Sequence, residues 1–143
     1  MKKYGDCIIT NSKWEILLLQ RAEDDDFEPG VWCLPGGKIE QGETDIEGAT
    51  RELFEETNID CELEGPVYEE DRGDNISYYF EGSVSDDVDI TLDDTEHSAS
   101  MWVSVDDLTD YDLILDLGDI LSNILETPED NMLFERFKVL AGL

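Results

Sequence analysis

Short apolar runs separated by polar turns recur along most of the chain, which has 143 residues. Residues 8–10 and 15–20 are two such runs, and the turn-forming residues 11–13 between them predict a pair of neighbouring strands. Further strands are predicted over residues 31–34, 59–63, 67–68, 76–84 and 99–105. The pattern therefore predicts a sheet of several strands.

A helix is predicted after the glycine turn at residues 41–43, where apolar residues begin to recur at helical spacing. Thr44 or Asp45 is the expected N-cap, because either side chain can accept from an amide of the first turn. The helix is expected to run to about Thr57. Asn58 is then a suitable stop, since asparagine tolerates the left-handed conformation that often ends a helix.

A second helix is predicted over residues 105–125, where leucine and isoleucine recur every three or four positions. Pro128 interrupts this pattern, and residues 131–141 predict a last short helix. No internal repeat, low-complexity linker or domain boundary divides the chain. A single domain over residues 1–143 is therefore expected.

The charge is strongly unbalanced, with 38 acidic residues, 9 basic residues and a formal net charge of -29. Such a surface repels nucleic acids, whose binding depends on Lys and Arg contacts to phosphates, and it also repels anionic membranes. No run approaches the roughly 20 apolar residues of a membrane span, and no leader opens the chain. A cytoplasmic protein is expected, and an anionic substrate would need a cation as intermediary.

The three cysteines, Cys7, Cys33 and Cys61, are widely spaced and odd in number. They form no CxxC pair, so reduced thiols in or near the core are expected.

Three glutamates, Glu52, Glu55 and Glu56, gather on one side of the first predicted helix. At about 100° per residue they span an arc of about 100°, along the edge of the face that would pack on a sheet. Like charges at this spacing repel by a few tenths of a kcal/mol per exposed pair. Either this side is simply solvated, or a cation binds among the carboxylates, as Mg²⁺ prefers. The pattern leaves both interpretations open.

Residues 36–59, GGKIEQGETDIEGATRELFEETNI, resemble the Nudix hydrolase signature. That signature is Gly, five residues, Glu, seven residues, Arg-Glu-aliphatic, one residue, Glu-Glu, one residue, Gly, aliphatic. The matching residues are Gly37, Glu43, Arg51, Glu52, Leu53, Glu55, Glu56 and Ile59. Asn58 stands where the family has glycine. Residues 30–35 and 96–103 also resemble the family, so the resemblance covers about residues 5–108.

The resemblance implies an α+β fold, an α/β/α sandwich with a mixed β-sheet between helices. It also implies hydrolysis of a nucleoside diphosphate linked to another moiety, with Mg²⁺ or Mn²⁺ as cofactor. By matching position, the implied metal ligands are Glu52, Glu55, Glu56 and the carbonyl of Gly36. Arg51 would pair with a nearby carboxylate and orient it.

The general base stays open between two residues, because the resemblance places it either in the signature helix or in a later loop. Glu52 is the candidate in the helix and Glu96 the candidate in the loop. The predicted catalytic residues are therefore Arg51, Glu52, Glu55 and Glu96, and the predicted substrate-binding residues are Arg21, Gly37 and Lys38. His97, the single histidine, is expected to be a hydrogen-bonding neighbour.

Two other functions stay open at this point: a Nudix fold that senses a nucleotide without cleaving it, and an acidic protein that docks on basic partners. No sequence marker distinguishes ADP-ribose, dinucleoside polyphosphates, sugar nucleotides or oxidised nucleoside triphosphates as the substrate. The apolar residues 132–134 and Phe137 suggest a homodimer contact.

Overall fold

The computed structural model describes residues 1–23, 29–93, 95–114 and 116–125. In chain order the elements are β1 (Lys2–Thr10), β2 (Glu15–Arg21), β3 (Trp32–Cys33), β4 (Gly36–Lys38), α1 (Asp45–Thr57), β5 (Glu64–Asp71), β6 (Asn75–Ser83), β7 (His97–Ser104), the 3-10 helix η1 (Val105–Asp110) and α2 (Leu117–Leu125). The predicted helix over residues 131–141 and the apolar residues 132–134 and 137 lie outside the described residues.

The sheet is organised around β1, which pairs antiparallel with β2 and β4 and parallel with β6. The pairing with β2 confirms the strand pair predicted from the first two apolar runs. Beyond β6 lies β5, and β2 pairs in addition with β3 and β7. Because β4 pairs with the first half of β1, Gly36 lies directly beside Asp6.

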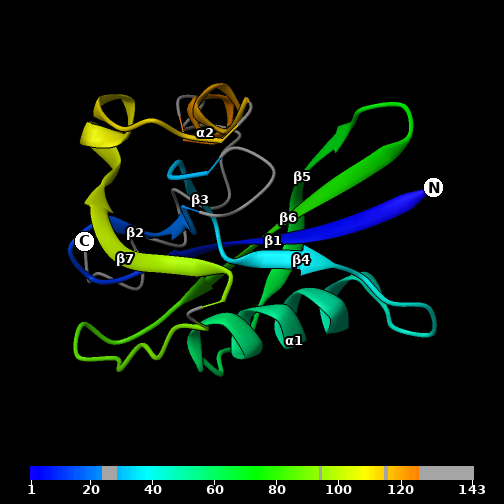
Figure 1. The fold of residues 1–143 in the computed structure, drawn as a ribbon, viewed down its shortest axis with the longest axis horizontal. Coiled ribbons are helices and arrows are strands. Elements are labelled where there is room, and N and C mark those ends of the chain that lie inside the picture. Colours follow the sequence, from blue (N-terminus) through cyan, green and yellow to red (C-terminus); the bar gives the residue numbers. More distant parts are fainter. Residues whose placement is uncertain (24–28, 94, 115, 126–143) are drawn as a thin grey trace.

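The mixed sheet lies between helices, with α1 on one side of the strands and α2 on the other (Figure 1). Successive side chains of β1 point to opposite faces of the sheet, and both faces of this strand are covered by a helix. Cys7 and Ile9 share a buried cluster with Ala49 of α1, whereas Ile8 packs with Leu121 of α2. The expected α/β/α sandwich is confirmed. Among the described residues, no helix is long and apolar enough to cross a membrane.

The predicted ends of α1 are confirmed. Thr44 is the N-cap: its side chain accepts from the amide of Glu47, whose side chain in turn accepts from the amide of Thr44. This reciprocal capping box satisfies two amides that have no partner within the helix. At the other end Asn58 adopts φ 63° and ψ 17°, and its amide donates to the carbonyl of Phe54. Asparagine therefore supplies the left-handed residue that usually is glycine.

A close approach of backbones fixes α1 against the sheet. A Cβ atom on Gly5 of β1 would lie 2.8 Å from the Cβ of Ala49, so the glycine lets the helix rest directly on the strand. This contact holds the acidic side of α1 next to β4.

The predicted strand over residues 59–63 is wrong, since this segment is irregular. Its apolar residues Ile59 and Leu63 are buried in the cluster beneath α1, so hydrophobic burial alone explains the pattern. Conversely, residues 36–38 form the short strand β4, which was not predicted because two glycines give no apolar signal.

The single helix predicted over residues 105–125 is also wrong. The chain forms η1 and then leaves helical structure before α2 begins at Leu117. Between them, Trp32 of β3 donates its amide to the carbonyl of Asp112 and accepts at its carbonyl from the amide of Ile114. These bonds to a strand use backbone groups that a continuous helix would keep for itself.

Candidate functional site

A cavity of about 670 Å³ lies beside the acidic side of α1. Its acidic lining residues are Asp6, Glu52, Glu56, Glu96 and Asp116, and its basic ones are Arg21, Lys38 and Arg72. Gly36, Gly37, Cys33 and His97 also line it. The cavity therefore collects ionisable side chains from both ends of the described chain.

Glu56 is the most deeply placed carboxylate of this cavity, with a relative exposure of 4%. The amide of Gly36 donates a hydrogen bond of 2.6 Å to its Oε1 atom. Burial, together with the nearby charges of Glu96, Glu52 and Asp6, raises the pKa of Glu56 to about 9, although the hydrogen bond from Gly36 opposes this rise. Without a positive partner this group would hold a proton at neutral pH.

Asp6 of β1 is a second acid in the same cavity, and it is partly buried. Loss of solvent raises its pKa to about 7, and the positive charge of Arg72 limits that rise. Two neighbouring carboxyls whose ionisation is this unfavourable are unusual in a protein core unless they serve a bound ligand.

Gly37 makes room for the carboxylate of Glu52. A Cβ atom at this position would overlap the Oε2 and Cδ atoms of Glu52, so only glycine fits with the side chain as placed. Burial raises the pKa of Glu52, and the hydrogen bond from Arg51 counteracts that rise. β4 and α1 are thus packed so that this carboxylate faces the cavity.

Arg51 orders the outer carboxylates of α1. Its Nε atom lies 2.8 Å from Oε2 of Glu43, and its guanidinium also donates to Glu52 at 2.9 Å and to Glu55 at 3.2 Å. The same guanidinium donates to the carbonyl of Lys38. The hydrogen bond from Arg51 is the largest cause that lowers the pKa of Glu43 to about 2. One cation therefore joins the loop before the helix to two of its glutamates.

Glu96, in the turn before β7, and His97, the first residue of β7, both line the cavity. The carbonyl of Glu96 accepts from the amide of Ala22, and the amide of His97 donates to the carbonyl of Asp93. His97 is 4% exposed and lies between two partners. Its Nδ1 atom is 3.4 Å from Oε2 of Glu56, and its Nε2 atom is 3.7 Å from Sγ of Cys33. The expectation of a hydrogen-bonding neighbour fits this placement.

The donor set suits a hard divalent cation. Carboxylate oxygens of Glu52, Glu56 and Glu96 and the backbone of Gly36 line one cavity, and Mg²⁺ and Mn²⁺ take oxygen ligands of this kind. A cation would also make the ionised state of the buried Glu56 favourable, which its own surroundings oppose.

A family model described as the NUDIX domain matches residues 5–124. The chain belongs to the Nudix family. The match includes the signature helix, the cavity and α2 up to Ile124.

Three similar Nudix proteins illustrate the relationship. A Bacillus subtilis (strain 168) protein named as a candidate 8-oxo-dGTP diphosphatase is 32% identical over 99 residues, which is 68% of this chain and 62% of that protein. The 8-oxo-dGDP phosphatase NUDT18 of Homo sapiens is 42% identical over 59 residues, 41% of this chain and 18% of that protein. The crystal structure of a MutT protein from Methanosarcina mazei Go1 superposes with a TM-score of 0.70 at 26% identity, and the match covers 96% of this chain and 93% of that chain. The matched region thus spans less than two thirds of both curated relatives.

The Nudix fold brings most of the predicted site residues to the cavity. Those that line it are Arg21, Gly36, Gly37, Lys38, Glu52, Glu56 and Glu96. Arg51 lies behind them and holds carboxylates. Glu55 is not among the lining residues, and its side chain, 54% exposed, is turned toward Arg51.

Sequence reasoning missed the second half of the cavity. Arg72 donates to Asp116 at 2.9 Å and to Ser77 at 2.8 Å, and Asp6 lies within reach of its charge. The available signal was Asp6 itself, an acid directly before the apolar residues 7–9 of β1, because a carboxyl with little access to solvent needs a reason.

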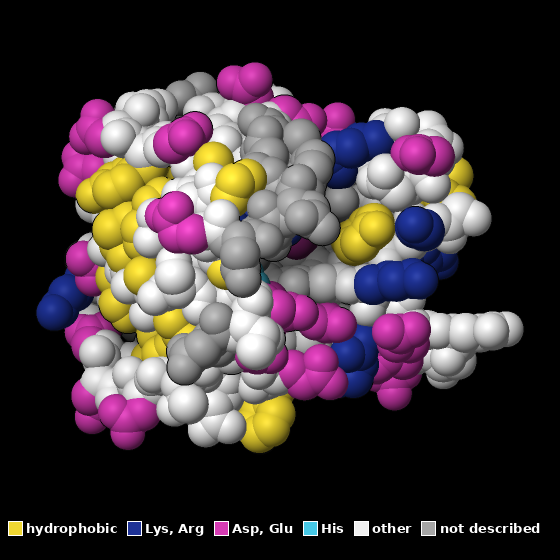
Figure 2. All heavy atoms as spheres, in the orientation of Figure 1, with side chains coloured by type: hydrophobic (Ala, Val, Ile, Leu, Met, Phe, Trp, Pro, Cys, Tyr) yellow, Lys and Arg dark blue, Asp and Glu magenta, His cyan; other side chains and the backbone are white. Residues whose placement is uncertain are grey.

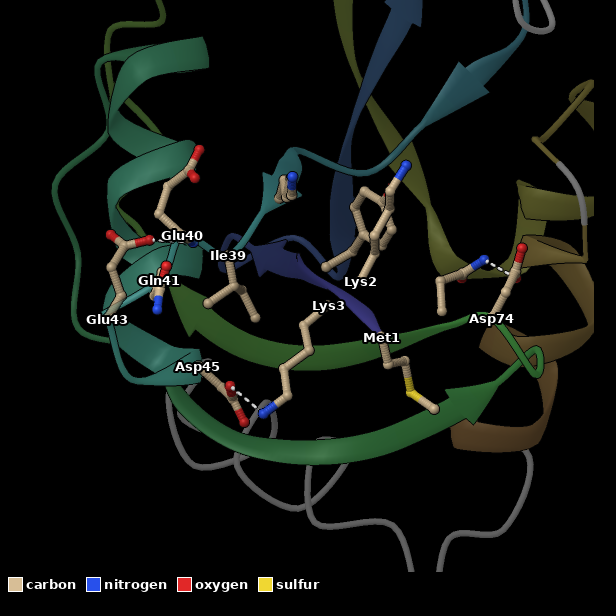
Figure 3. Close-up of a pocket in the computed structure, with 13 residues that line it drawn as sticks. Met1, Lys2, Lys3, Ile39, Glu40, Gln41, Glu43, Asp45 and Asp74 are labelled. Atoms are coloured by element: carbon tan, nitrogen blue, oxygen red, sulfur yellow. Dashed lines mark hydrogen bonds and ion pairs between the residues drawn. The ribbon is translucent and has the colours of Figure 1, made fainter.

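A second, more open cavity of about 840 Å³ adjoins the first, and the two share Tyr4, Lys38 and Asn75. Figure 3 shows Lys3 reaching Asp45 there, at 3.6 Å. Within the described residues, every Lys and Arg except Lys13 lines one of the two cavities or bonds to a residue that does. Figure 2 shows several of these cations gathered at the right of the view, on an otherwise acidic surface.

Proposed function

We propose that the chain is a metal-dependent hydrolase that cleaves a diphosphate linkage in a nucleoside di- or triphosphate or a related nucleotide derivative. The observation that carries the proposal is Glu56, a buried carboxyl surrounded by Asp6, Glu52 and Glu96 in one cavity. Burying the ionised form of such a carboxyl costs free energy unless a cation binds beside it. In a Nudix chain, a cation at this place would offset the negative charge that protein and substrate share.

Glu52, Glu56 and the carbonyl of Gly36 are the proposed residues that hold Mg²⁺ or Mn²⁺, with Glu55 at the rim. When bound, a divalent cation neutralises phosphate charge and lowers the pKa of a coordinated water. Arg51 acts as a positioning residue, because its bonds to Glu43, Glu52 and Glu55 fix where the carboxylates point.

Glu52 is the proposed general base. Its carboxylate faces the cavity, Arg51 orients it, and its raised pKa brings its proton affinity closer to neutral pH, where a base works best. It would take the proton of the water that attacks phosphorus. Glu96, which lines the same cavity, is proposed to be a further metal ligand rather than the base.

Arg21 and Lys38 are the proposed phosphate contacts. Both line the cavity, and both are among the few cations of a chain with net charge -29. Gly37 would let phosphate and backbone approach each other, because it carries no side chain to intervene.

The names of the two curated relatives supply the first substrates for a test, 8-oxo-dGTP and 8-oxo-dGDP. We propose oxidised guanine nucleotides as the substrate class on that ground. ADP-ribose, dinucleoside polyphosphates and sugar nucleotides complete the panel.

The deciding experiment measures product formation from this panel with Mg²⁺, with Mn²⁺ and with a chelator, for the natural chain and for Glu56→Gln. We expect turnover of at least one nucleotide that requires the cation and is lost in the variant. Hydrolysis in ¹⁸O-labelled water then identifies which phosphorus water attacks. Tight nucleotide binding without turnover in any metal would instead identify a nucleotide sensor. If no nucleotide binds, the interaction protein becomes the better description.

A further inference from the structure

Three potential metal-binding atoms come together in the cavity, in a cluster that does not include Glu52. One oxygen each from Glu56 and Glu96 and a ring nitrogen of His97 all lie within 4.8 Å of one another. Glu56 lies on α1, His97 is the first residue of β7 and Glu96 directly precedes it, so the cluster joins residues 40 positions apart in the sequence. The cluster therefore differs from the all-carboxylate helix in containing a nitrogen.

The orientation of the His97 ring suits metal binding. Nδ1 faces Oε2 of Glu56 at 3.4 Å, while Nε2 faces Sγ of Cys33 at 3.7 Å. A ligating histidine commonly donates its second N–H to a neighbouring acceptor, which fixes the tautomer and the ring plane. Cys33 stands in the place of that acceptor, and a proton on Nε2 leaves the lone pair of Nδ1 directed toward Glu56.

The distances require little movement. Ligands with bonds of about 2.1 Å to one ion lie at most about 4.2 Å apart. The cluster atoms lie within 4.8 Å of one another, so the separation to be closed is at most about 0.6 Å, which rotation of the exposed Glu96 side chain can supply. Backbone movement is unnecessary: hydrogen bonds already hold Glu96 and His97 beside Ala22 and Asp93.

We propose that Nδ1 of His97 is a metal ligand together with Glu56 and Glu96, and that this nitrogen makes the site favour Mn²⁺ over Mg²⁺. The inference rests on the proposed function, in which divalent cations bind among these carboxylates. Mg²⁺ is a hard ion that prefers oxygen ligands, whereas imidazole is a good ligand for the first-row transition metals. A single histidine thus separates this site from one made of carboxylates alone.

A simpler arrangement would also place Nδ1 near Glu56, namely an ion pair between an imidazolium and the carboxylate. Metal ligation and the ion pair differ in a measurable way, because electron spin is transferred from Mn²⁺ to a nitrogen only when that nitrogen is a ligand. The chain contains one histidine, so isotopic labelling of histidine reports on His97 alone when the protein is made without a histidine tag.

The test is pulsed electron paramagnetic resonance of the Mn²⁺-loaded, untagged full chain. We expect nitrogen modulation that changes from the ¹⁴N to the ¹⁵N pattern when only histidine is labelled, and that is absent in His97→Gln. Mn²⁺ bound with a spectrum insensitive to the label would overturn the inference and leave the proposed function standing. Failure to bind Mn²⁺ and Mg²⁺ altogether would overturn both.

Calorimetric titration measures the affinity for each ion as a second test, with Glu96→Gln as the control variant. His97→Gln should weaken Mn²⁺ binding by at least about tenfold and change Mg²⁺ binding by less than about threefold, since the lost ligand is a nitrogen. Glu96→Gln, which replaces a carboxylate ligand by a neutral amide, should weaken the binding of both ions. An unchanged ratio of Mn²⁺ to Mg²⁺ affinity in His97→Gln contradicts the proposal.

Discussion

The amide of Gly36 donates a 2.6 Å hydrogen bond to Oε1 of Glu56, and this bond joins the short strand β4 to the last turn of α1. It holds a buried carboxyl in a fixed position while leaving Oε2 directed toward His97. The arrangement stabilises the ionised form only in part, because burial still raises the pKa of Glu56 to about 9. A cation is the remaining source of stabilisation that the proposed function supplies.

Replacing Glu56 or Glu55 by glutamine tests the proposed ligands. Each variant should lower turnover by at least a factor of about 100, since loss of charge stabilisation of a few kcal/mol has an effect of that size. The larger loss is expected for Glu56→Gln, because Glu56 lines the cavity whereas Glu55 lies at its rim. The measurement is kcat at saturating Mg²⁺, with circular dichroism as the check on folding. Unchanged turnover in both variants would remove these residues from the metal site.

The pH dependence of stability should run opposite to that of an ordinary acidic protein between pH 5 and 9. Glu56 and Asp6 have pKa values of about 9 and about 7 in the folded chain, against ordinary values of 4.5 and 3.8 for these side chains. The folded state therefore binds more protons than the unfolded state in this range. It follows that the free energy of unfolding falls as pH rises, by up to about 1.4 kcal/mol per pH unit for each group.

Urea unfolding at fixed ionic strength, with a chelator present, measures this slope. Glu56→Gln is the control and should flatten the upper part of the range, where only Glu56 titrates. Mg²⁺ should also reduce the slope, because it binds the ionised carboxylates of the folded state and stabilises that state by mass action. An identical slope in the natural chain and in Glu56→Gln would contradict the assignment.

Gly37→Ala should damage catalysis more than stability. The added Cβ overlaps the carboxylate of Glu52, which must rotate away from its place beside Arg51 and the cavity. We expect a loss of about 10- to 100-fold in kcat, as for a misplaced catalytic group, with a change in unfolding free energy of less than about 1 kcal/mol. Gly118→Ala is the matched control, since its nearest neighbour would be 3.7 Å away, and it should retain turnover. Equal activity of the two variants would show that Glu52 needs no such space.

Local parts of this structure were predictable from sequence. Thr44 and Asn58 mark the ends of α1 through bonds to residues three or four positions away, so their chemistry is visible in the sequence itself. The gathering of Glu52 and Glu56 on one side follows from helical geometry alone.

The rest depends on contacts between distant segments. Asp6 meets Arg72 only because β1 pairs in parallel with β6 and β5 returns beside it, and no short pattern encodes that pairing. The helix predicted over residues 105–125 is wrong for the same reason. The backbone groups of Asp112 and Ile114 form hydrogen bonds with Trp32, which is far away in the sequence, instead of with each other's neighbours in a helix. Tertiary competition of this kind overrides helical periodicity.

Asn58 is the one departure from the Nudix signature, and its conformation predicts what substitution there will do. With φ 63° it occupies the left-handed region, which costs most side chains roughly 1–2 kcal/mol. Asn58→Gly should therefore change the unfolding free energy by less than about 1 kcal/mol and turnover by less than about threefold, because glycine adopts this conformation freely. Asn58→Val should destabilise by more, since a β-branched side chain resists positive φ.

Urea unfolding and steady-state kinetics of these two variants separate the effect of the helix cap on stability from any effect on catalysis. Asn58 is exposed and its amide bonds to Phe54, whereas Glu56 lies on the buried side of the same turn. Valine should thus lower stability while kcat of the folded fraction stays within about threefold of the natural chain. If valine is tolerated as well as glycine, the left-handed cap contributes nothing to stability. If valine lowers kcat by tenfold or more in folded protein, the end of α1 sets the position of Glu56, and the departure from glycine bears on catalysis.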